Sequence, residues 1–164
     1  MALQDSALSA RRFTGEISKV LCVCVGNICR SPMAALLLSE RLSGLVEGAT
    51  IESAGVAALV AEPADPVAVA LMKERGLDLS RHRARQLTAE MASGFELILV
   101  MDDHQRRAVE RIFPEGRGRI HRLGRFGGFD VPDPYRKPRA AFEGSLALIE
   151  RGLADFERAF WSAG

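Results

Sequence analysis

The segment KVLCVCVGNICRSP, residues 19–32, joins a short apolar run to a tight loop and a helix start. Residues 19–25 are almost wholly apolar, which is typical of a strand buried within a sheet. Residues 26–30 interrupt this run, and Ser31-Pro32 then form a helix-starting pair before the Ala- and Leu-rich residues 33–42. The segment therefore predicts a strand, a loop and a helix in immediate succession.

Beyond this segment the chain continues to alternate between strand and helix patterns. Strands are predicted at 50–54, 95–101 and 119–123, and helices at 65–75, 102–112 and 139–161, with a loop at 124–138. This alternation predicts an α/β fold: a single domain with a small, about four-stranded parallel sheet flanked by helices on both faces. Right-handed crossovers then bring the 24–30 loop to the edge where the strands end.

Composition excludes several classes of protein. The 164 residues are 48% apolar and 26% charged, and the net charge is +1. This balance leaves no overall positive charge that would favour binding to nucleic acid or to an anionic membrane. No apolar run is long enough to span a bilayer. The Arg-rich stretch 106–125 has acids interspersed and is interpreted as a solvated face. Residues 1–16 are expected to form a disordered tail, and 17–164 the domain.

The three cysteines lie within eight residues of one another, at 22, 24 and 29. An odd, clustered set does not build a disulfide framework, which favours a reducing compartment and a cytoplasmic location. A zinc site would lack a fourth ligand, because no histidine lies nearby in sequence. No Gly-x4-Gly-Lys pattern supports nucleotide binding.

The loop carries the residue types of a phosphate-binding site. Cys24 and Arg30 form a C-x5-R pattern followed by Ser31. Successive backbone N–H groups of such a loop can wrap a phosphate, and the positive end of the helix stabilises a thiolate at Cys24. The planar guanidinium of Arg30 can hold two phosphoryl oxygens at once. Ser31 either donates a hydrogen bond to the thiolate or caps the helix.

Two further residues suit this loop, although a simpler interpretation exists. Gly26 permits close backbone approach, and Asn27 tolerates a left-handed conformation. The simpler interpretation makes Cys24 a small buried hydrophobe at a strand end. The preceding strand, the internal Gly-Asn and the following Ser-Pro helix start favour the phosphate loop instead.

With these residues in place, CVGNICRSP at 24–32 resembles the phosphate-binding loop of the low-molecular-weight protein tyrosine phosphatases. The resemblance continues at 52–55 (ESAG), 84–86 (ARQ), 101–102 (MD) and 133–135 (DPY), and so spans about residues 17–161. Val23, not His, precedes the cysteine, which separates the chain from the dual-specificity phosphatases and their relatives. Residues 131–137 (VPDPYRK) and 141–143 (AFE) are most similar to the bacterial exopolysaccharide-associated subgroup.

The resemblance implies roles for individual residues. It implies Cys24 as nucleophile, Arg30 as phosphate-binding and transition-state group, and Asp133 as general acid. Asp before Pro is equally favoured in turns, so the pattern alone leaves this last role open. Phosphate and substrate contacts are implied for Val25, Gly26, Asn27, Ile28, Cys29, Ser31, Tyr135 and Leu59. His82 would brace the loop with Ser53 and Asn27, whereas His104 and His121 are interpreted as surface residues.

The resemblance also implies the reaction and its partner. The implied substrate is a tyrosine-phosphorylated protein, in this subgroup a bacterial tyrosine autokinase of exopolysaccharide or capsule production. No metal or cofactor is needed. Arg136, Lys137 and Arg139 beside the acid are candidates for docking a multiply phosphorylated tail, or simply begin a solvated helix. Mild peroxide is expected to join Cys24 and Cys29 in a reversible disulfide.

Two rival functions remain at this point. A thioredoxin-coupled arsenate reductase shares this fold and loop but relays a disulfide through additional downstream cysteines, and no cysteine follows Cys29. A non-catalytic phosphate-binding module is the other rival. Binding alone needs no thiolate, so the joint presence of Cys24, Arg30, Ser31 and Asp133 argues against it.

Overall fold

A computed structural model describes residues 17–162 and shows a four-stranded sheet in the order β2-β1-β3-β4, in which all paired strands are parallel. The strands are β1 (Lys19–Cys24), β2 (Thr50–Gly55), β3 (Leu97–Val100) and β4 (Ile120–Arg122). The predicted tail at 1–16 lies outside the described residues. The strand pairing confirms the predicted parallel sheet.

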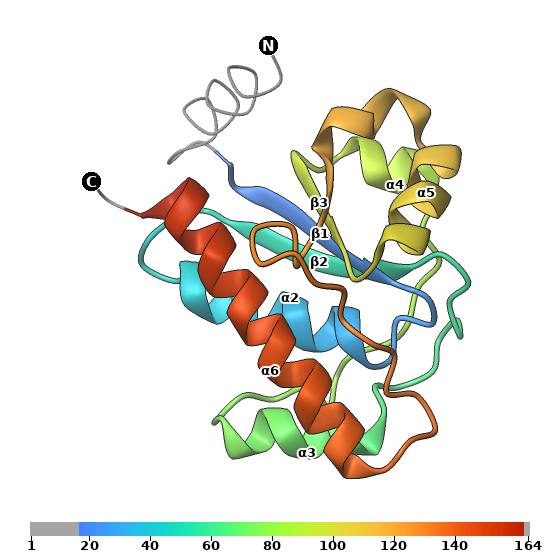
Figure 1. Cartoon of the computed structure of the whole chain (residues 1–164), viewed down its shortest axis with the longest axis vertical. Helices are drawn as coiled ribbons and strands as arrows, with labels where there is room; N and C mark the ends of the chain where they lie inside the picture. The colour runs from blue at the N-terminus through green and yellow to red at the C-terminus, as the bar shows by residue number, and fades with distance from the viewer. Residues whose placement is uncertain (1–16, 163–164) are drawn as a thin grey trace.

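Helices cover both faces of this sheet (Figure 1). One face carries α2 (Arg30–Leu42), α3 (Pro66–Glu74) and α6 (Arg139–Phe156), and the other carries α4 (Ala89–Ser93) and α5 (Asp103–Ile112). A 3-10 turn, η1 (Pro114–Arg119), precedes β4, and a π-helical turn, η2 (Glu157–Trp161), ends the described chain. The predicted α/β architecture is therefore confirmed.

The alternation of side chains along β1 explains the two layers. Val20 and Cys22 pack into the larger core with α2, α3 and α6, whereas Leu21 and Val23 pack into the smaller core beneath α4 and α5. Successive side chains of a strand point to opposite faces, so a continuous apolar run is what a sheet covered on both sides requires. Burying each large apolar side chain contributes roughly 1.5–3 kcal/mol.

The predicted elements differ from the observed ones mainly at their ends. The predicted helix at 139–161 ends its α-helical part at Phe156 and widens into η2, where the Trp161 indole donates to the Ile17 carbonyl at 3.0 Å. The sequence patterns gave no sign of α4, because five residues are too few to show a helical period.

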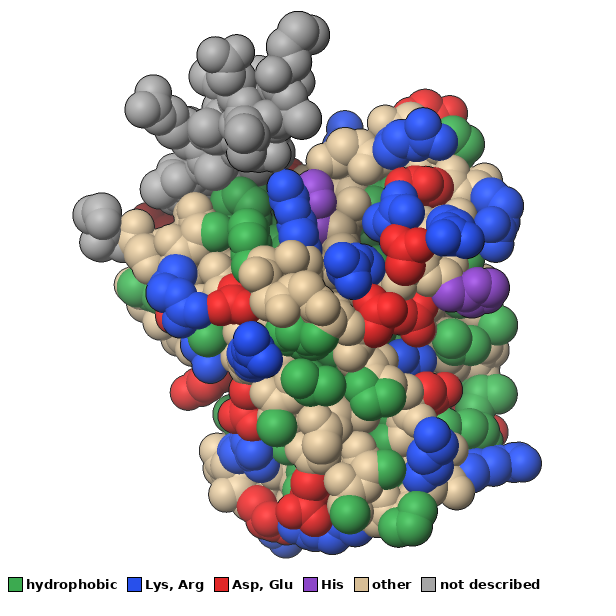
Figure 2. Space-filling view, in the orientation of Figure 1, with side chains coloured by type: hydrophobic (Ala, Val, Ile, Leu, Met, Phe, Trp, Pro, Cys, Tyr) green, Lys and Arg blue, Asp and Glu red, His purple; other side chains and the backbone are tan. Residues whose placement is uncertain are grey.

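The Arg-rich stretch forms a mixed-charge surface. On α5, Arg106 pairs with Asp103 and Glu110, and Arg107 also pairs with Asp103. Figure 2 shows blue and red side chains interspersed over this part of the molecule. The surface is therefore the solvated face that the sequence predicts. None of the helices within residues 17–162 is both long and apolar enough to cross a membrane.

Candidate active site

The candidate site lies where β1 ends and α2 begins. Cys24 is the last residue of β1 and Arg30 the first of α2, so the loop between them follows the carboxyl edge of a strand with neighbours on both sides. The helix begins at Arg30, one residue before the predicted Ser-Pro pair, and its N-cap Cys29 makes no side-chain cap bond. Free N–H groups at a helix start can favour a bound anion at this loop.

A hollow of about 130 Å³ opens over the loop. It is lined by Cys24, Val25, Gly26, Ile28, Cys29, Arg30, Ala57, Leu59, Asp133 and Tyr135. Every predicted site residue is in this set except Asn27 and Ser31, which are fully buried and do not line the hollow. Ala57 is an addition that no pattern in the sequence indicates. The structure thus brings the predicted residues together, while their roles stay predictions.

The Cys24 thiol has a hydroxyl partner. Its Sγ lies 2.8 Å from the Ser31 Oγ, and the thiol group is almost completely buried. The Asn27 Nδ2 donates to the same Ser31 Oγ at 2.8 Å, so the single hydroxyl proton is left for another acceptor. The Cys24 sulfur at 2.8 Å is closer than the Ala54 carbonyl at 3.4 Å. The arrangement suits a thiolate that accepts a hydrogen bond from Ser31.

Asn27 fixes the shape of the loop. Its φ is +59°, the left-handed conformation expected from the sequence, and it is fully buried. Its side chain donates to the Ser53 Oγ at 3.0 Å and accepts from the Arg85 N–H at 2.9 Å. The His82 Nε2 donates to its carbonyl at 2.6 Å, so His82 and Ser53 contact the residue that they were predicted to brace.

Gly55 lets the loop lie close to β2. A Cβ at this position would meet the Val25 carbonyl oxygen at 2.4 Å, which real side chains do not tolerate. The glycine of the 52–55 motif is therefore a requirement of close backbone approach.

Arg30 is buried and held from several sides. Its guanidinium donates to the Val131 carbonyl at 2.8 Å and lies 3.6 Å from an Asp102 carboxylate oxygen and 3.7 Å from one of Asp133. The sequence indicates Asp102 as the start of a predicted helix and as part of the 101–102 motif, and one of its carboxylate oxygens accepts from the Gln105 N–H. Its second oxygen orients Arg30, a contact that local sequence patterns do not show. A guanidinium held this way needs little reorganisation to meet a phosphate.

Asp133 and Tyr135 reach the hollow from a loop distant in sequence. The Val131 N–H donates to the Met101 carbonyl at 2.8 Å, which ties this loop to the end of β3. The Asp133 carboxylate accepts from the Tyr135 N–H at 3.1 Å and is half exposed. The structure thus shows Asp133 as a turn residue that also faces the Cys24–Arg30 loop, while its role as general acid stays a prediction.

The other thiols differ from Cys24 in environment. All three cysteines are free and buried. Burial raises the pKa of the Cys22 thiol to about 12, with a smaller effect from Cys24. Burial also raises the pKa of Cys29 above its usual range, and the Asp65 carboxylate raises it further. Both thiols are therefore protonated at neutral pH, and the peroxide-induced Cys24–Cys29 disulfide stays a prediction.

The remaining histidines are not part of the site. His104 is exposed, as expected. His121 is half buried rather than on the surface, and burial together with the charge of Arg125 lowers its pKa to about 4. His121 on the edge strand β4 is therefore only partly at the surface, whereas the sequence predicts a surface residue. Within residues 17–162, no three His, Cys, Asp or Glu side chains are grouped to hold a metal ion.

A buried cysteine and a buried arginine that flank a strand-to-helix loop are typical of enzymes that bind a phosphate group in such a loop. The model of the low molecular weight phosphotyrosine protein phosphatases matches residues 19–160, and the chain belongs to that family. The predicted resemblance and the predicted class of enzyme, a protein-tyrosine phosphatase, are confirmed.

Individual relatives support this assignment. EpsP of Ralstonia solanacearum is 47% identical, over 84% of this chain and 92% of its own. The low molecular weight protein-tyrosine-phosphatase Wzb of Salmonella typhimurium is 41% identical, over 87% and 93%. The solved structure of Vibrio vulnificus Wzb in complex with benzylphosphonate superposes with a TM-score of 0.81 at 38% identity, covering 87% of this chain and 98% of that one. These relatives confirm the resemblance to the exopolysaccharide-associated subgroup.

Proposed function

We propose that this protein hydrolyses phosphotyrosine in a bacterial protein through a cysteinyl-phosphate intermediate. The observation that carries the proposal is the convergence of the Cys24 thiol, the Arg30 guanidinium and the Asp133 carboxyl on one hollow with apolar walls. Leu59 and Tyr135, each about two-fifths exposed, stand at its mouth, where a phenyl ring would lie. The related Vibrio vulnificus Wzb has been solved in complex with benzylphosphonate, in which one CH2 group joins a phenyl ring to a phosphonate, and this supports an aryl phosphate as substrate.

In the first step the Cys24 sulfur attacks phosphorus and the bond from phosphorus to the tyrosine oxygen breaks. The phenolate leaves poorly unless it gains a proton, which Asp133 supplies. Arg30 and the loop N–H groups hold the three non-bridging oxygens as charge shifts among them. Ser31, already hydrogen-bonded to the sulfur, stabilises the thiolate as nucleophile and later as leaving group.

In the second step water attacks phosphorus and the sulfur–phosphorus bond breaks. Asp133, now a carboxylate, takes the proton from water, as microscopic reversibility requires. Thiolate and inorganic phosphate are released, and the enzyme returns to its starting state. The residues present complete the cycle without a metal or an organic cofactor.

Asp133→Ala is the experiment that tests the assignment of the acid. It should slow phosphotyrosine hydrolysis by about 10²–10⁴-fold, because only a poor leaving group needs the proton. Aryl phosphates with good leaving groups should lose much less in the phosphorylation step, measured as the pre-steady-state burst. Asp130→Ala is a matched control, since Asp130 lies in the same loop but pairs with Arg122. Equal losses for both substrate classes would remove Asp133 from the acid role.

We infer that the physiological substrate is a bacterial tyrosine autokinase of exopolysaccharide or capsule production, and that the reaction takes place in the cytoplasm. The relatedness to EpsP and Wzb supports this partner. A tail with several phosphotyrosines would carry about −1.5 to −2 charge on each phosphate. Cationic side chains beside the hollow would attract it.

The structure narrows the candidate docking residues. Arg139 pairs with Glu74 at 2.6 Å and with Glu143 at 3.4 Å, so its charge is already matched. Arg136 lies over the Tyr135 ring, 5.2 Å from its centroid, and Lys137 is exposed beside it. Arg136 and Lys137 therefore carry the docking part of the proposal.

Exchanging Arg136 and Lys137 together for glutamine should raise KM for a multiply phosphorylated tail peptide about threefold to tenfold at low salt. The effect should fade with added salt, because exposed charges are screened. Both kcat and the KM for p-nitrophenyl phosphate should barely change. Arg139→Gln is the control and should have a smaller effect on the peptide. An unchanged peptide KM at low salt in the double variant would contradict docking at this rim.

A further inference from the structure

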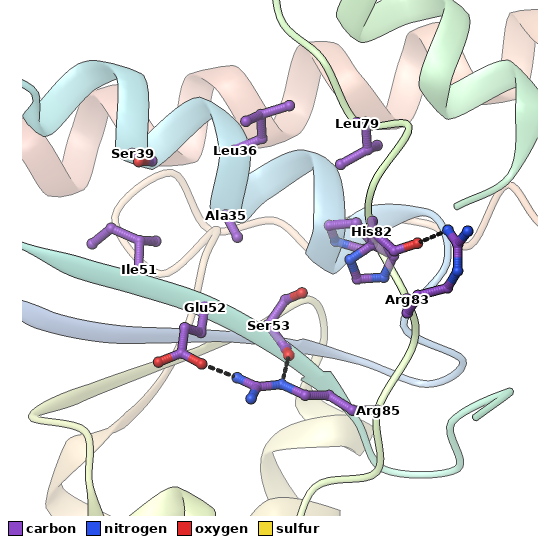
Figure 3. A pocket seen from close by; sticks show the side chains of 11 residues that line it. Ala35, Leu36, Ser39, Ile51, Glu52, Ser53, Leu79, His82, Arg83 and Arg85 are labelled. Carbon is purple, nitrogen blue, oxygen red and sulfur yellow. Dashed lines mark hydrogen bonds and ion pairs between the residues drawn. The ribbon is translucent and has the colours of Figure 1, made fainter. Parts of the chain in front are cut away.

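A second hollow, which we call the rear groove, lies behind the loop formed by residues 24–30. We call this loop the catalytic loop. Its volume is about 310 Å³, and it shares no lining residue with the hollow above Cys24. Figure 3 shows its three sides: α2 with Ala35 and Leu36, the strand β2 with Ile51, and the segment that carries Leu79 and His82. Nothing in the proposed reaction uses this space.

The rear groove has an apolar end and a cationic end. Ala35, Leu36, Ile51 and Leu79 supply apolar surface. At the other end Arg85 is neutralised by Glu52 at 2.5 Å and also donates to the Ser53 carbonyl. Arg83, in contrast, donates to the His82 carbonyl at 2.7 Å and forms no ion pair with any acid among residues 17–162. The groove therefore presents one unmatched positive charge beside apolar walls.

Three residues of the rear groove also hold the catalytic loop. The His82 ring donates to the Asn27 carbonyl at 2.6 Å, and the Arg85 backbone N–H donates to the Asn27 side chain at 2.9 Å. The Ser53 hydroxyl accepts from that side chain at 3.0 Å. Asn27 in turn donates to Ser31, the partner of the Cys24 sulfur. A molecule that moves His82 or Arg85 would thus change the support of the nucleophile through three successive hydrogen bonds.

We propose that the rear groove is a regulatory ligand site for small amphipathic monoanions, namely carboxylates attached to an aromatic or aliphatic body. The carboxylate meets Arg83 beside the His82 ring, and the apolar body lies on Leu36, Ile51 and Leu79. One negative charge complements the one unmatched guanidinium, and the hydrocarbon covers surface that is otherwise in contact with water. Binding here does not depend on the proposed reaction, whereas its effect on turnover does.

A carboxylate bound in the rear groove should change the pKa of His82 in one direction. Burial lowers the pKa of its imidazole, and the charges of Arg83 and Arg85 lower it further. A bound carboxylate adds a negative charge beside the ring and so raises that pKa.

Naphthalene-2-carboxylate is a suitable probe, and naphthalene-2-carboxamide is its neutral match. With the full chain, the carboxylate should bind with a Kd of about 1 mM or tighter. NMR signals of Leu36, Ile51, Leu79 and His82 should shift, and the His82 titration should move to higher pH. With p-nitrophenyl phosphate as substrate, kcat should fall while KM stays nearly constant.

Variants separate the rear groove from other sites. Arg83→Gln should weaken binding of the carboxylate about tenfold, as expected for loss of one charge-assisted hydrogen bond. Ser39→Glu, which places a negative charge at the groove edge, should also weaken it. Arg81→Gln is the matched control: Arg81 is exposed, two residues away and outside the lining, and its loss should change Kd by less than about twofold.

Each alternative result overturns the proposal. Shifts confined to Leu59 and Tyr135 with competitive inhibition would place the probe in the active-site hollow. Equally tight binding of the neutral carboxamide would contradict a site for anions. So would the absence of NMR shifts at the groove residues up to about 10 mM carboxylate. NMR detects binding of the carboxylate without any turnover. If the proposed reaction were wrong, the NMR shifts would remain and only the effect on kcat would be absent.

Discussion

Replacing Cys24 with serine should abolish hydrolysis of both p-nitrophenyl phosphate and phosphotyrosine peptides, with a loss of at least about 10⁴-fold in kcat. The serine hydroxyl is similar in shape to the thiol and can still form a hydrogen bond with Ser31. It does not lose its proton near neutral pH, so no anionic nucleophile forms. Steady-state turnover of the purified variant measures the effect.

Retained phosphate binding by Cys24→Ser would show that the loop still folds, so the loss could not be attributed to misfolding. This variant also separates the proposed enzyme from a phosphate-binding module, which would be indifferent to the exchange. Activity within about tenfold of the wild type would contradict a covalent role for Cys24. A substrate-trapping pulldown with the same variant would identify the protein partner.

Arg30→Lys should lower kcat/KM by about 10³-fold, despite the retained charge. The guanidinium at this position is held by contacts to the Val131 carbonyl, Asp102 and Asp133, and it lines the hollow. Its planar fork of N–H donors can hold two phosphoryl oxygens at once. An ammonium group offers a single point of charge and would follow the nearby carboxylates instead.

Arg41→Lys is the matched control for this exchange. Arg41 lies on the same helix and pairs with Glu157 at 3.6 Å, away from the site. It should keep kcat/KM within about twofold, because the exchange retains the charge and this partly exposed ion pair lies outside the hollow. Similar losses for both variants would show that the effect comes from α2 as a whole and not from phosphate recognition.

The catalytic loop is predictable from the sequence because its determinants are consecutive. A buried strand, a residue suited to positive φ and a helix start fix the loop within residues 19–32, and no distant contact is needed to propose it. The sheet follows in the same way from the alternation of apolar runs and helical patterns. Short elements such as α4 lack this local signal.

Contacts across the chain set the limit of such prediction. Nothing local distinguishes Asp133 from an ordinary turn residue, because its approach to Arg30 depends on how residue 131 pairs with the end of β3. The same holds for the Arg30–Asp102 contact and for Arg139, whose partner Glu74 lies on another helix. The rear groove has walls from three separate segments, so no single stretch of sequence reveals it.

The measurement that tests the central claim most directly is the trapping of the intermediate. Asp133→Ala should hydrolyse the cysteinyl-phosphate slowly while p-nitrophenyl phosphate still forms it, so acid quenching during turnover should capture it. Mass spectrometry of the digested protein should then find one phosphoryl group on the peptide that contains Cys24. A phosphoryl group on another residue, or a burst of p-nitrophenol with no phosphorylated peptide under these conditions, would contradict the account.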